Sequence, residues 1–241
     1  MKTALIITSI VSDAIRIRRS ILDAEYDMKI CCDGGLDRAA ELGVKPDILL
    51  GDFDSAQHFA VPDDQADEPD DIPDEAPSDD AGEDEEPEDG GEAELIVLPH
   101  EKDVTDTEAA VDLAYERGAR VITIIGGLGG RLDHTLANLG LLAKYLGKAD
   151  IFILDGDNFV RMFAPGSHMI VGAGYDYLGL IPFGGPVTGL TLENVKYPLT
   201  DCDVDGTTSL TVSNEITDDP AKIIFRTGKL LVIQSDDIIR F

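Results

Sequence analysis

Two aspartates separated by one residue stand in the segment Gly51-Asp52-Phe53-Asp54-Ser55, directly after a short apolar run. Two unpaired carboxylates in close contact are costly unless a cation or a proton lies between them. Magnesium, held by a few protein carboxylates and by substrate phosphates, is the usual solution. Taken alone, the segment is equally compatible with a turn in which the aspartates cap neighbouring backbone groups.

Two further polar segments also follow apolar runs. The glycines of Asp33-Gly34-Gly35 carry no Cβ, so backbone N–H groups there can approach a phosphate or a ribose. In Lys102-Asp103-Val104-Thr105-Asp106, the lysine is suited to pair with a phosphate. Asp106 falls in the first turn of an expected helix, where a negative charge is favourable for structural reasons alone. Each segment therefore has a plain structural interpretation beside the functional one.

A fourth segment, Gly126–Gly130, is rich in glycine and leads from an expected strand into an expected helix. Such a passage makes an anion-binding helix start. It lacks the Gly-Lys-Ser/Thr of a P-loop and does not fit GxGxxG. Arg131, Asp133, His134 and Asn138 add polar groups at this helix start. His134 by itself would also fit a structural histidine.

The elements that must position these segments alternate between strand and helix. Apolar runs predict strands at 3–8, 28–32, 48–50, 95–98, 121–125 and 151–154, and helices are expected at 36–42, 105–118 and 133–146. Thr105 and Glu108 have the spacing of a capping box at the start of the second helix. This alternation predicts a parallel sheet covered on both faces. Because ligands bind beyond the carboxyl ends of parallel strands, we expect all four polar segments to converge on one edge.

That convergence favours a metal and phosphate site over four unrelated turns.

After Asp155 the pattern changes to short strands spaced by glycine and proline turns, without a helix-period segment. Residues 223–225 and 230–233, joined through Thr227-Gly228, carry the signal of a β-hairpin. We therefore expect an α/β domain over residues 1–156 and an all-β domain over residues 157–241.

The chain of 241 residues has a formal net charge of −29, but the excess is local. Residues 62–94 contain 18 acidic residues and no Lys or Arg, which leaves −11 for the rest. This segment is too polar to bury a core and is predicted to be a disordered acidic insertion. The acidic surface argues against nonspecific binding to nucleic acid or to anionic membranes.

No apolar run reaches the roughly 18 residues that span a bilayer. The first residues have no small-residue cleavage site and are interpreted as a strand, so the cytoplasm is the expected location. The three cysteines, Cys31, Cys32 and Cys202, fit neither a zinc site nor a disulfide framework and are expected to be buried thiols.

The four segments, in this order, resemble the thiamine pyrophosphokinase family. The similarity includes Gly43-Val44-Lys45-Pro46-Asp47 before the paired aspartates, and Gly127-Leu128-Gly129-Gly130-Arg131-Leu132-Asp133-His134. It continues in the second half with 192–199 and Ser213-Asn214-Glu215. Each motif is weak alone, whereas the ordered set is specific and covers nearly all of the chain outside residues 60–94.

The resemblance implies transfer of a pyrophosphoryl group from ATP to the hydroxyl of thiamine, giving thiamine diphosphate and AMP. It also implies a homodimer with active sites at the dimer cleft. The implied fold is α/β plus all-β, with an N-terminal Rossmann-like parallel-sheet domain followed by a C-terminal β-sandwich domain.

The resemblance further implies site residues. Mg²⁺ would be held by Asp52, Asp54 and Asp106. ATP would lie along Asp33, Gly34, Gly35, Ser55, Lys102, Asp103, Thr105 and Arg131. Thiamine would be contacted by Asp133, His134, Asn138, Ser213, Asn214 and, because the chain has no tryptophan, Tyr197. The expected catalytic residues are Asp54, Asp106 and Asp133, with either Asp106 or Asp133 orienting or deprotonating the thiamine hydroxyl.

Two other functions are alternatives to this one. A metal-dependent phosphoesterase acting on a nucleotide or polyphosphate could use Asp33, Asp52, Asp54 and Asp106 for two metals. The chain has only 4 histidines, and this function gives no reason for the Ser213-Asn214 segment. A non-enzymatic acidic binding protein rests only on residues 62–94 and leaves the four converging segments unexplained.

Overall fold

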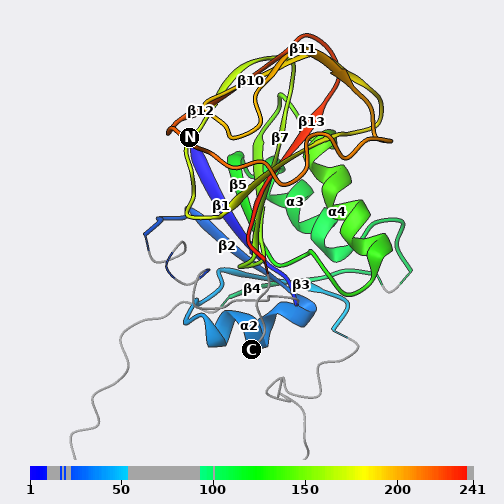
Figure 1. Cartoon of the computed structure of the whole chain (residues 1–241). Helices are drawn as coiled ribbons and strands as arrows, with labels where there is room; N and C mark the ends of the chain where they lie inside the picture. The colour runs from blue at the N-terminus through cyan, green and yellow to red at the C-terminus, as the bar shows by residue number, and fades with distance from the viewer. Residues whose placement is uncertain (10–16, 18, 20–22, 54–92, 100, 238–241) are drawn as a thin grey trace, which may run out of the picture.

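The computed structural model describes residues 1–9, 17, 19, 23–53, 93–99 and 101–237. Its main feature is a nine-stranded sheet in the order β4-β3-β2-β1-β5-β6-β7-β13-β9 (Figure 1). The first six of these strands are parallel. They are β1 Lys2–Ile7, β2 Met28–Cys32, β3 Ile48–Gly51, β4 Glu94–Val97, β5 Ala119–Ile125 and β6 Asp150–Leu154.

The centre of the parallel part is apolar on both faces. In β1, Leu5 and Ile7 face one layer of the core while Ala4 and Ile6 face the other, and all four are at most 1% exposed. A near-continuous apolar run of this kind is what a parallel strand covered on both sides requires. The predicted parallel α/β arrangement is confirmed.

Helices cover both faces of this sheet. α3 (Asp106–Glu116) and α4 (Leu132–Lys144) pack on one face, and α2 (Leu36–Glu41) packs on the other. A 3-10 turn, η1 (Asp33–Gly35), connects β2 to α2. Thr105 Oγ1 accepts a hydrogen bond from the Glu108 backbone N–H at 3.1 Å, so the predicted cap of α3 is present.

α3 and α4 are joined by polar contacts as well as by the core. Lys144 Nζ lies 2.7 Å from Asp112 Oδ1 and 2.9 Å from Glu108 Oε1. The Tyr145 hydroxyl donates a short hydrogen bond to the same Asp112 carboxylate. Burial and the Asp112 hydrogen bond raise the pKa of Tyr145, so this hydroxyl keeps its proton. These contacts hold the two helices whose first turns face the carboxyl edge of the sheet.

A second, four-stranded antiparallel sheet has the order β11-β10-β12-β8. Its strands are β8 Gly166–Ile170, β10 Val187–Glu193, β11 Leu199–Val204 and β12 Ala221–Phe225. It packs against the antiparallel end of the main sheet, formed by β7 Asn158–Phe163, β9 Tyr177–Pro182 and β13 Leu230–Ser235. In β13, Val232 faces this second sheet and Leu231 faces the core shared with α3 and α4.

One layer of the β-sandwich is therefore the continuation of the main sheet. β7 pairs with β6 through Ile153↔Val160, so the sheet runs on across residues 156 and 157. The predicted fold class, α/β plus all-β with a β-sandwich, is confirmed, whereas the domain boundary at residue 156 stays a prediction. In the described part of the chain, no helix follows α4.

The predicted hairpin between 223–225 and 230–233 is wrong. β12 belongs to the four-stranded sheet and β13 to the nine-stranded sheet, so the two strands are not paired. The chain crosses from one layer to the other at Gly228, which has φ +96°. A Cβ there would lie 2.5 Å from Pro186 O, so the crossing requires glycine. Local turn residues alone do not distinguish a crossing between layers from a hairpin.

The predicted acidic insertion ended one residue too late. Glu94 is the first residue of β4, where its backbone N–H bonds to Asp47 O at 2.9 Å. Its carboxylate accepts two hydrogen bonds from Arg117, at 2.6 and 2.7 Å. These contacts give an acidic side chain a place in an edge strand. The rest of the predicted insertion, apart from Ala93, lies outside the described residues.

The prediction of buried thiols is met in part. Cys31 and Cys32 are buried and Cys202 is partly exposed, and all three are free. Burial raises the pKa of Cys31 to about 12.

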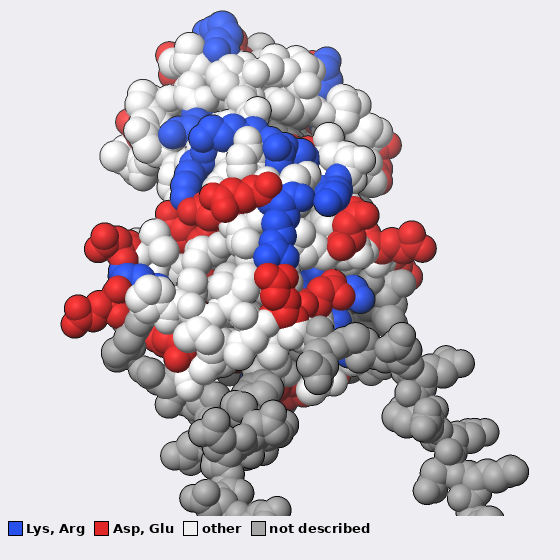
Figure 2. All heavy atoms as spheres, turned by 180° about the vertical axis from the view of Figure 1, so that it is seen from behind, with Lys and Arg blue, Asp and Glu red and all other residues white. Residues whose placement is uncertain are grey.

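In Figure 2, Lys and Arg side chains gather in a band across the middle of one face, with acidic side chains beside and below it. None of the helices in the described residues is both long and apolar enough to span a membrane.

The close packing of η1 on β1 can be tested with paired glycine substitutions. A Cβ on Gly35 would lie 2.4 Å from Ile7 O, so we expect Gly35→Ala to lower the free energy of unfolding by about 1–3 kcal/mol. Gly140, inside α4, has no atom within 4 Å of the corresponding position. Gly140→Ala should instead raise stability by about 0.5–1 kcal/mol.

Urea denaturation of both variants and the parent protein measures these changes. Equal effects of the two substitutions would contradict the described packing at Gly35.

Candidate active site

The crevice beyond the carboxyl ends of β1 and β5 is where the strand order reverses. From β1 the chain builds β2, β3 and β4 toward one edge, while β5 and β6 lie on the other side. Ile7 is level with Cys31 of β2 and with Ile125 of β5. The segments that follow these residues therefore leave the sheet at the same height. Such a reversal point is the usual ligand site of an open parallel sheet.

A cavity of about 640 Å³ opens at this edge. It is lined by Thr8, Ser9, Cys32, Gly34, Asp52, Lys102, Val104, Thr105, Asp106, Thr107, Arg131 and His134. The lining comes from the ends of β1, β2 and β3, from the start of α3 and from the segment before α4. The predicted convergence of the four polar segments is therefore observed in space.

Lys102 lies between two of the predicted metal ligands. Its Nζ is 2.6 Å from Asp106 Oδ1 and 4.0 Å from Asp52 Oδ2. The Lys102 side chain is 15% exposed, so this charge sits inside the cavity wall. The lysine offsets part of the repulsion that would arise between two carboxylates held in one place.

Part of this cluster fits a hard cation. Asp106 Oδ1 is buried and, despite its short distance to Lys102, has no partner with hydrogen-bond geometry. Carboxylate oxygens of this kind are the ligands that Mg²⁺ prefers. Within the described residues, no group of three or more His, Cys, Asp or Glu side chains could hold a metal ion. Asp54 and Ser55 lie outside the described residues, so two of the three predicted ligands can be located.

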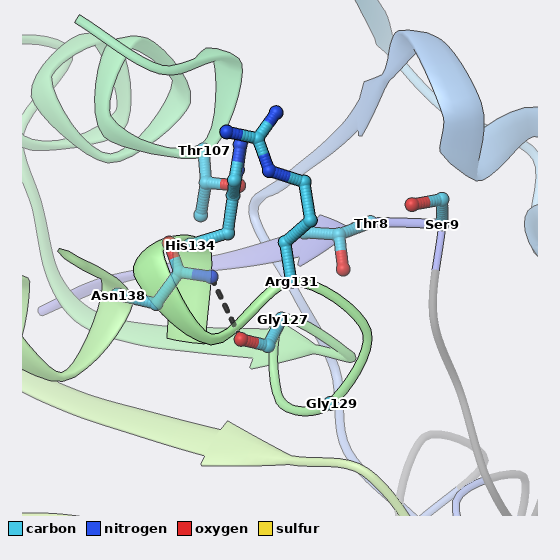
Figure 3. Close-up of a pocket in the computed structure, with 8 residues that line it drawn as sticks. All are labelled: Thr8, Ser9, Thr107, Gly127, Gly129, Arg131, His134 and Asn138. Carbon is cyan, nitrogen blue, oxygen red and sulfur yellow. Dashed lines mark hydrogen bonds between the residues drawn. The ribbon is translucent and has the colours of Figure 1, made fainter. Parts of the chain in front are cut away.

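A smaller cavity of about 310 Å³ adjoins the first and shares five residues with it. Figure 3 shows its lining residues, with Gly127 and Gly129 on the loop that precedes α4. Asn138 Nδ2 donates a hydrogen bond to Gly127 O at 2.8 Å, and Asn138 is 4% exposed. Gly127 has φ +81°, which favours glycine. Asn138 thus braces the loop, and its predicted contact with the substrate stays a prediction.

Arg131 lines both cavities and forms an exposed ion pair with Asp133, which lines neither. Arg131 Nε and one terminal nitrogen donate to the two Asp133 oxygens at 3.1 and 2.6 Å. The Arg131 hydrogen bonds, together with the His134 backbone N–H, hold the pKa of Asp133 below its usual value. Asp133 is therefore a poor proton acceptor near neutral pH, although it can accept a hydrogen bond.

Glycines in two of the polar segments, Gly34 and Gly51, allow the close packing that positions the cavity wall. A Cβ on Gly34 would lie 2.8 Å from Ser9 Cβ, and one on Gly51 would lie 2.6 Å from Asp33 Cβ. The turn after β2 thus closes tightly on the segment after β1. Asp103 is exposed and lines neither cavity. Its position in a single chain therefore does not support the predicted contact with ATP.

Thr8, Ser9 and Thr107 line both cavities and were not among the predicted site residues. Thr8 and Ser9 can be identified as candidates from the sequence, because they are polar residues directly after the apolar run of the first strand. Thr107 stands beside Asp106 in the first turn of α3, where the preceding Thr105 is the cap. The periodic pattern of α3 does not distinguish a helix residue facing the cavity from one facing solvent.

Comparison with known proteins gives the family. Residues 83–153 match the family model "Thiamin pyrophosphokinase, catalytic domain", and residues 167–230 match "Thiamin pyrophosphokinase, vitamin B1 binding domain". A thiamine pyrophosphokinase of Bacillus subtilis is 38% identical over 146 residues, which cover 59% of this chain and 68% of that protein. The chain belongs to the thiamine pyrophosphokinase family.

Solved structures of the family agree over the whole chain. The thiamine pyrophosphokinase of B. subtilis has a TM-score of 0.76 at 26% identity, covering 99% of this chain and 100% of that one. The Geobacillus thermodenitrificans protein has a TM-score of 0.72 at 29% identity, with full coverage of both chains.

More distant relatives are matched by sequence as well. A rice thiamine pyrophosphokinase is 24% identical over 54% of this chain and 53% of its own length.

Lys102, Asp106 and Arg131 fall within the match to the thiamine pyrophosphokinase catalytic domain, whereas Asp33 and Asp52 precede it. Tyr197, Ser213 and Asn214 fall within the match to the vitamin B1 binding domain. Among the described residues of a single chain, Tyr197, Ser213 and Asn214 are not part of the lining of either cavity.

Asn214 instead fixes the backbone around Tyr197. Its side chain accepts from Tyr197 N at 3.0 Å and donates to Tyr197 O at 2.9 Å. Asn214 also bridges to Leu178 of β9, the last strand of the main sheet. Because Asn214 lies five strand spacings from β5, it is roughly 24 Å from the crevice within one chain.

Removing Arg131 should change the ionisation of Asp133. We expect Arg131→Gln to raise the pKa of Asp133 toward its usual value, because the two guanidinium hydrogen bonds are lost. The carboxylate should then take up a proton at a higher pH than in the parent protein. A carboxyl NMR titration measures the midpoint, and an unchanged midpoint would show that the pair is not formed in solution.

Proposed function

We propose that this protein is a thiamine pyrophosphokinase that transfers the pyrophosphoryl group of ATP to the hydroxyl of thiamine, forming thiamine diphosphate and AMP. The observation that carries the proposal is the cluster of Asp52, Lys102 and Asp106 at the reversal point of the sheet, in a chain of this family. Polyphosphate transfer depends mainly on positioning and on charge stabilisation. A lysine between two carboxylates supplies groups for both.

Asp52, Asp106 and Asp54 are the proposed holders of Mg²⁺. The closeness of two carboxylates, Asp52 and Asp106, around Lys102 in the cavity wall supports this assignment. When bound, Mg²⁺ would neutralise part of the negative charge on the ATP phosphates. Lys102, once phosphates lie beside it, would pair with them as a point charge.

Arg131 and Asp133 are proposed to act where the phosphates meet thiamine. Both side chains are exposed, at 74% and 65%, and Arg131 lines the two cavities. Arg131 can exchange its pairing with Asp133 for a phosphate, since a guanidinium binds either group in a bidentate way. The lowered pKa of Asp133 favours orientation of the thiamine hydroxyl over removal of its proton.

A homodimer is part of the proposal, and the distance between the two sets of predicted residues supports it. Tyr197, Ser213 and Asn214 lie too far from the crevice of their own chain to share a ligand with it. Apolar side chains are exposed in both places: Leu132 at 69% and Leu136 at 54% on α4, and Tyr197 at 55% and Leu210 at 53% in the β-sandwich. Pairing these surfaces between two copies would bury both and would bring thiamine contacts to the crevice.

The phosphoesterase alternative has no supporting observation. The family models and the curated relatives that the chain matches are thiamine pyrophosphokinases. A cytoplasmic location and the absence of nucleic-acid or membrane partners belong to the proposal and are supported by the acidic composition.

Turnover with Mg²⁺, ATP and thiamine tests the proposal. We expect AMP to appear in step with thiamine diphosphate. Asp52→Asn and Asp106→Asn should each lower turnover by about 100-fold or more, because each removes charge stabilisation at the transferred group. Separation of the nucleotides and of the thiamine products measures both.

Asp150→Asn is the matched control, because Asp150 is exposed at the amino end of β6, away from the crevice. It should keep the parent rate. ADP as the product, or phosphate release without thiamine, would contradict the proposed function. Circular dichroism should show that the inactive variants remain folded.

A further inference from the structure

The loop that joins β5 to α4 has little means of holding its own shape. Four of its residues are glycines with positive φ, at +83° in Gly126, +81° in Gly127, +88° in Gly129 and +64° in Gly130. Glycine has more backbone freedom to lose than any other residue, so such a loop keeps one conformation only if other groups bind it. Gly126 N–H donates to Leu154 O at 2.7 Å, which fixes the start of the loop to β6. The rest of the loop depends on contacts from elsewhere.

The Thr135 hydroxyl binds the far end of this loop. Its Oγ1 accepts a hydrogen bond from Gly129 N–H at 3.1 Å and lies 3.2 Å from Gly129 O, to which it can donate. Its distance to Arg131 O is 3.4 Å. The contact with Arg131 O, one helical turn back, is one that a threonine in any helix can make. The contacts with Gly129 reach outside the helix and join α4 to the loop.

Thr135 acts beside Asn138 of the same helix. The two residues are one turn apart and lie on one face of α4, and Asn138 Nδ2 donates to Gly127 O at 2.8 Å. α4 therefore binds the loop at two points. In the described part of the chain, no side chain other than Thr135 bonds to the backbone of Gly129 or Gly130. The end of the loop thus depends on this one hydroxyl.

Arg131 follows the loop directly and has few other contacts that set its place. It is the N-cap of α4, with φ −72° and ψ 124°, and no side-chain hydrogen bond caps the helix there. Its side chain is 74% exposed, so packing does little to orient the guanidinium. Figure 3 shows Arg131 extending from the end of the loop. The position of the guanidinium beside the cavities therefore follows from the backbone that Thr135 holds.

We propose that Thr135 is a positioning residue of the transfer reaction, which holds the loop so that Arg131 meets the phosphates of the substrate. Thr135 lines neither cavity, so it acts through Arg131 and not by contact with a ligand. This inference rests on the proposed function, in which Arg131 exchanges its pairing with Asp133 for a phosphate.

Thr135→Val tests the role of the hydroxyl, because valine keeps the β-branched shape of threonine. With the hydrogen bonds to the loop lost, we expect kcat/KM for ATP to fall about 10-fold. Thr135→Ser, which keeps the hydroxyl, should stay near the parent value. Thr123→Val is the matched control, because Thr123 is half-buried on β5 and lines neither cavity, and it should keep the parent rate.

The decisive comparison is made in the Arg131→Gln background. Because Thr135 acts through Arg131, Thr135→Val should lower kcat/KM by less than about 2-fold there, so the two substitutions are not additive. A purely structural role of Thr135 would cost the same factor in both backgrounds. A loss of about 10-fold in the Arg131→Gln background would therefore overturn the inference.

A second measurement does not depend on turnover. Hydrogen exchange of the Gly129 amide, followed by NMR, should be faster in Thr135→Val than in the parent protein, because the Gly129 N–H loses its acceptor. It should be unchanged in Thr123→Val. Unchanged exchange at Gly129 in Thr135→Val would overturn the inference. Faster exchange in a protein that makes no thiamine diphosphate would support the hold of Thr135 on the loop and contradict the proposed function instead.

Discussion

The parallel pairing of β1 with β2 on one side and with β5 on the other is the constraint on which the site depends. Ile7 is level with both Cys31 and Ile125, so three chain segments leave the sheet at one height. A slip of one residue would move a strand end by roughly 3.3 Å. That shift would separate Ser9 from Gly34, which are now in close contact. Burial of β1 on both faces therefore fixes the crevice as well as the core.

The electrostatics of the crevice follow from this geometry. Asp52 after β3 and Asp106 at the start of α3 are brought beside Lys102, which compensates only part of their charge. One buried Asp106 oxygen has the Lys102 ammonium as its partner, so its second lone pair is available to a ligand. Lys144, the last residue of α4, binds Glu108 and Asp112 of α3, so the helix that starts at Asp106 and the helix that follows Arg131 are held together. Packing and charge thus place the polar groups before any ligand arrives.

Much of this could be predicted from the sequence, because apolar runs and polar strand ends are local signals. The alternation of strands and helices predicted the parallel sheet, and the capping pair Thr105 and Glu108 is present. The supposed hairpin failed, because the choice between pairing β12 with β13 and crossing between layers at Gly228 is made by tertiary packing. Thr107 was missed for a related reason, since its orientation toward the crevice depends on how α3 packs. Asn214 lies roughly 24 Å from the crevice of its own chain because of the order of the strands in the sheet. No local sequence pattern specifies that order.

The central claim is that the carboxylates at the reversal point bind the metal that accompanies ATP. The most direct measurement is the affinity for a non-hydrolysable ATP analogue with and without Mg²⁺, in the parent protein and in an Asp52→Asn, Asp106→Asn double variant. The parent should bind the analogue at least about 10-fold more tightly with Mg²⁺, a coupling of the usual size between two ligands of one site. The double variant should lose this dependence while remaining folded. An equal effect of Mg²⁺ on both proteins would contradict the assignment of these aspartates to the metal.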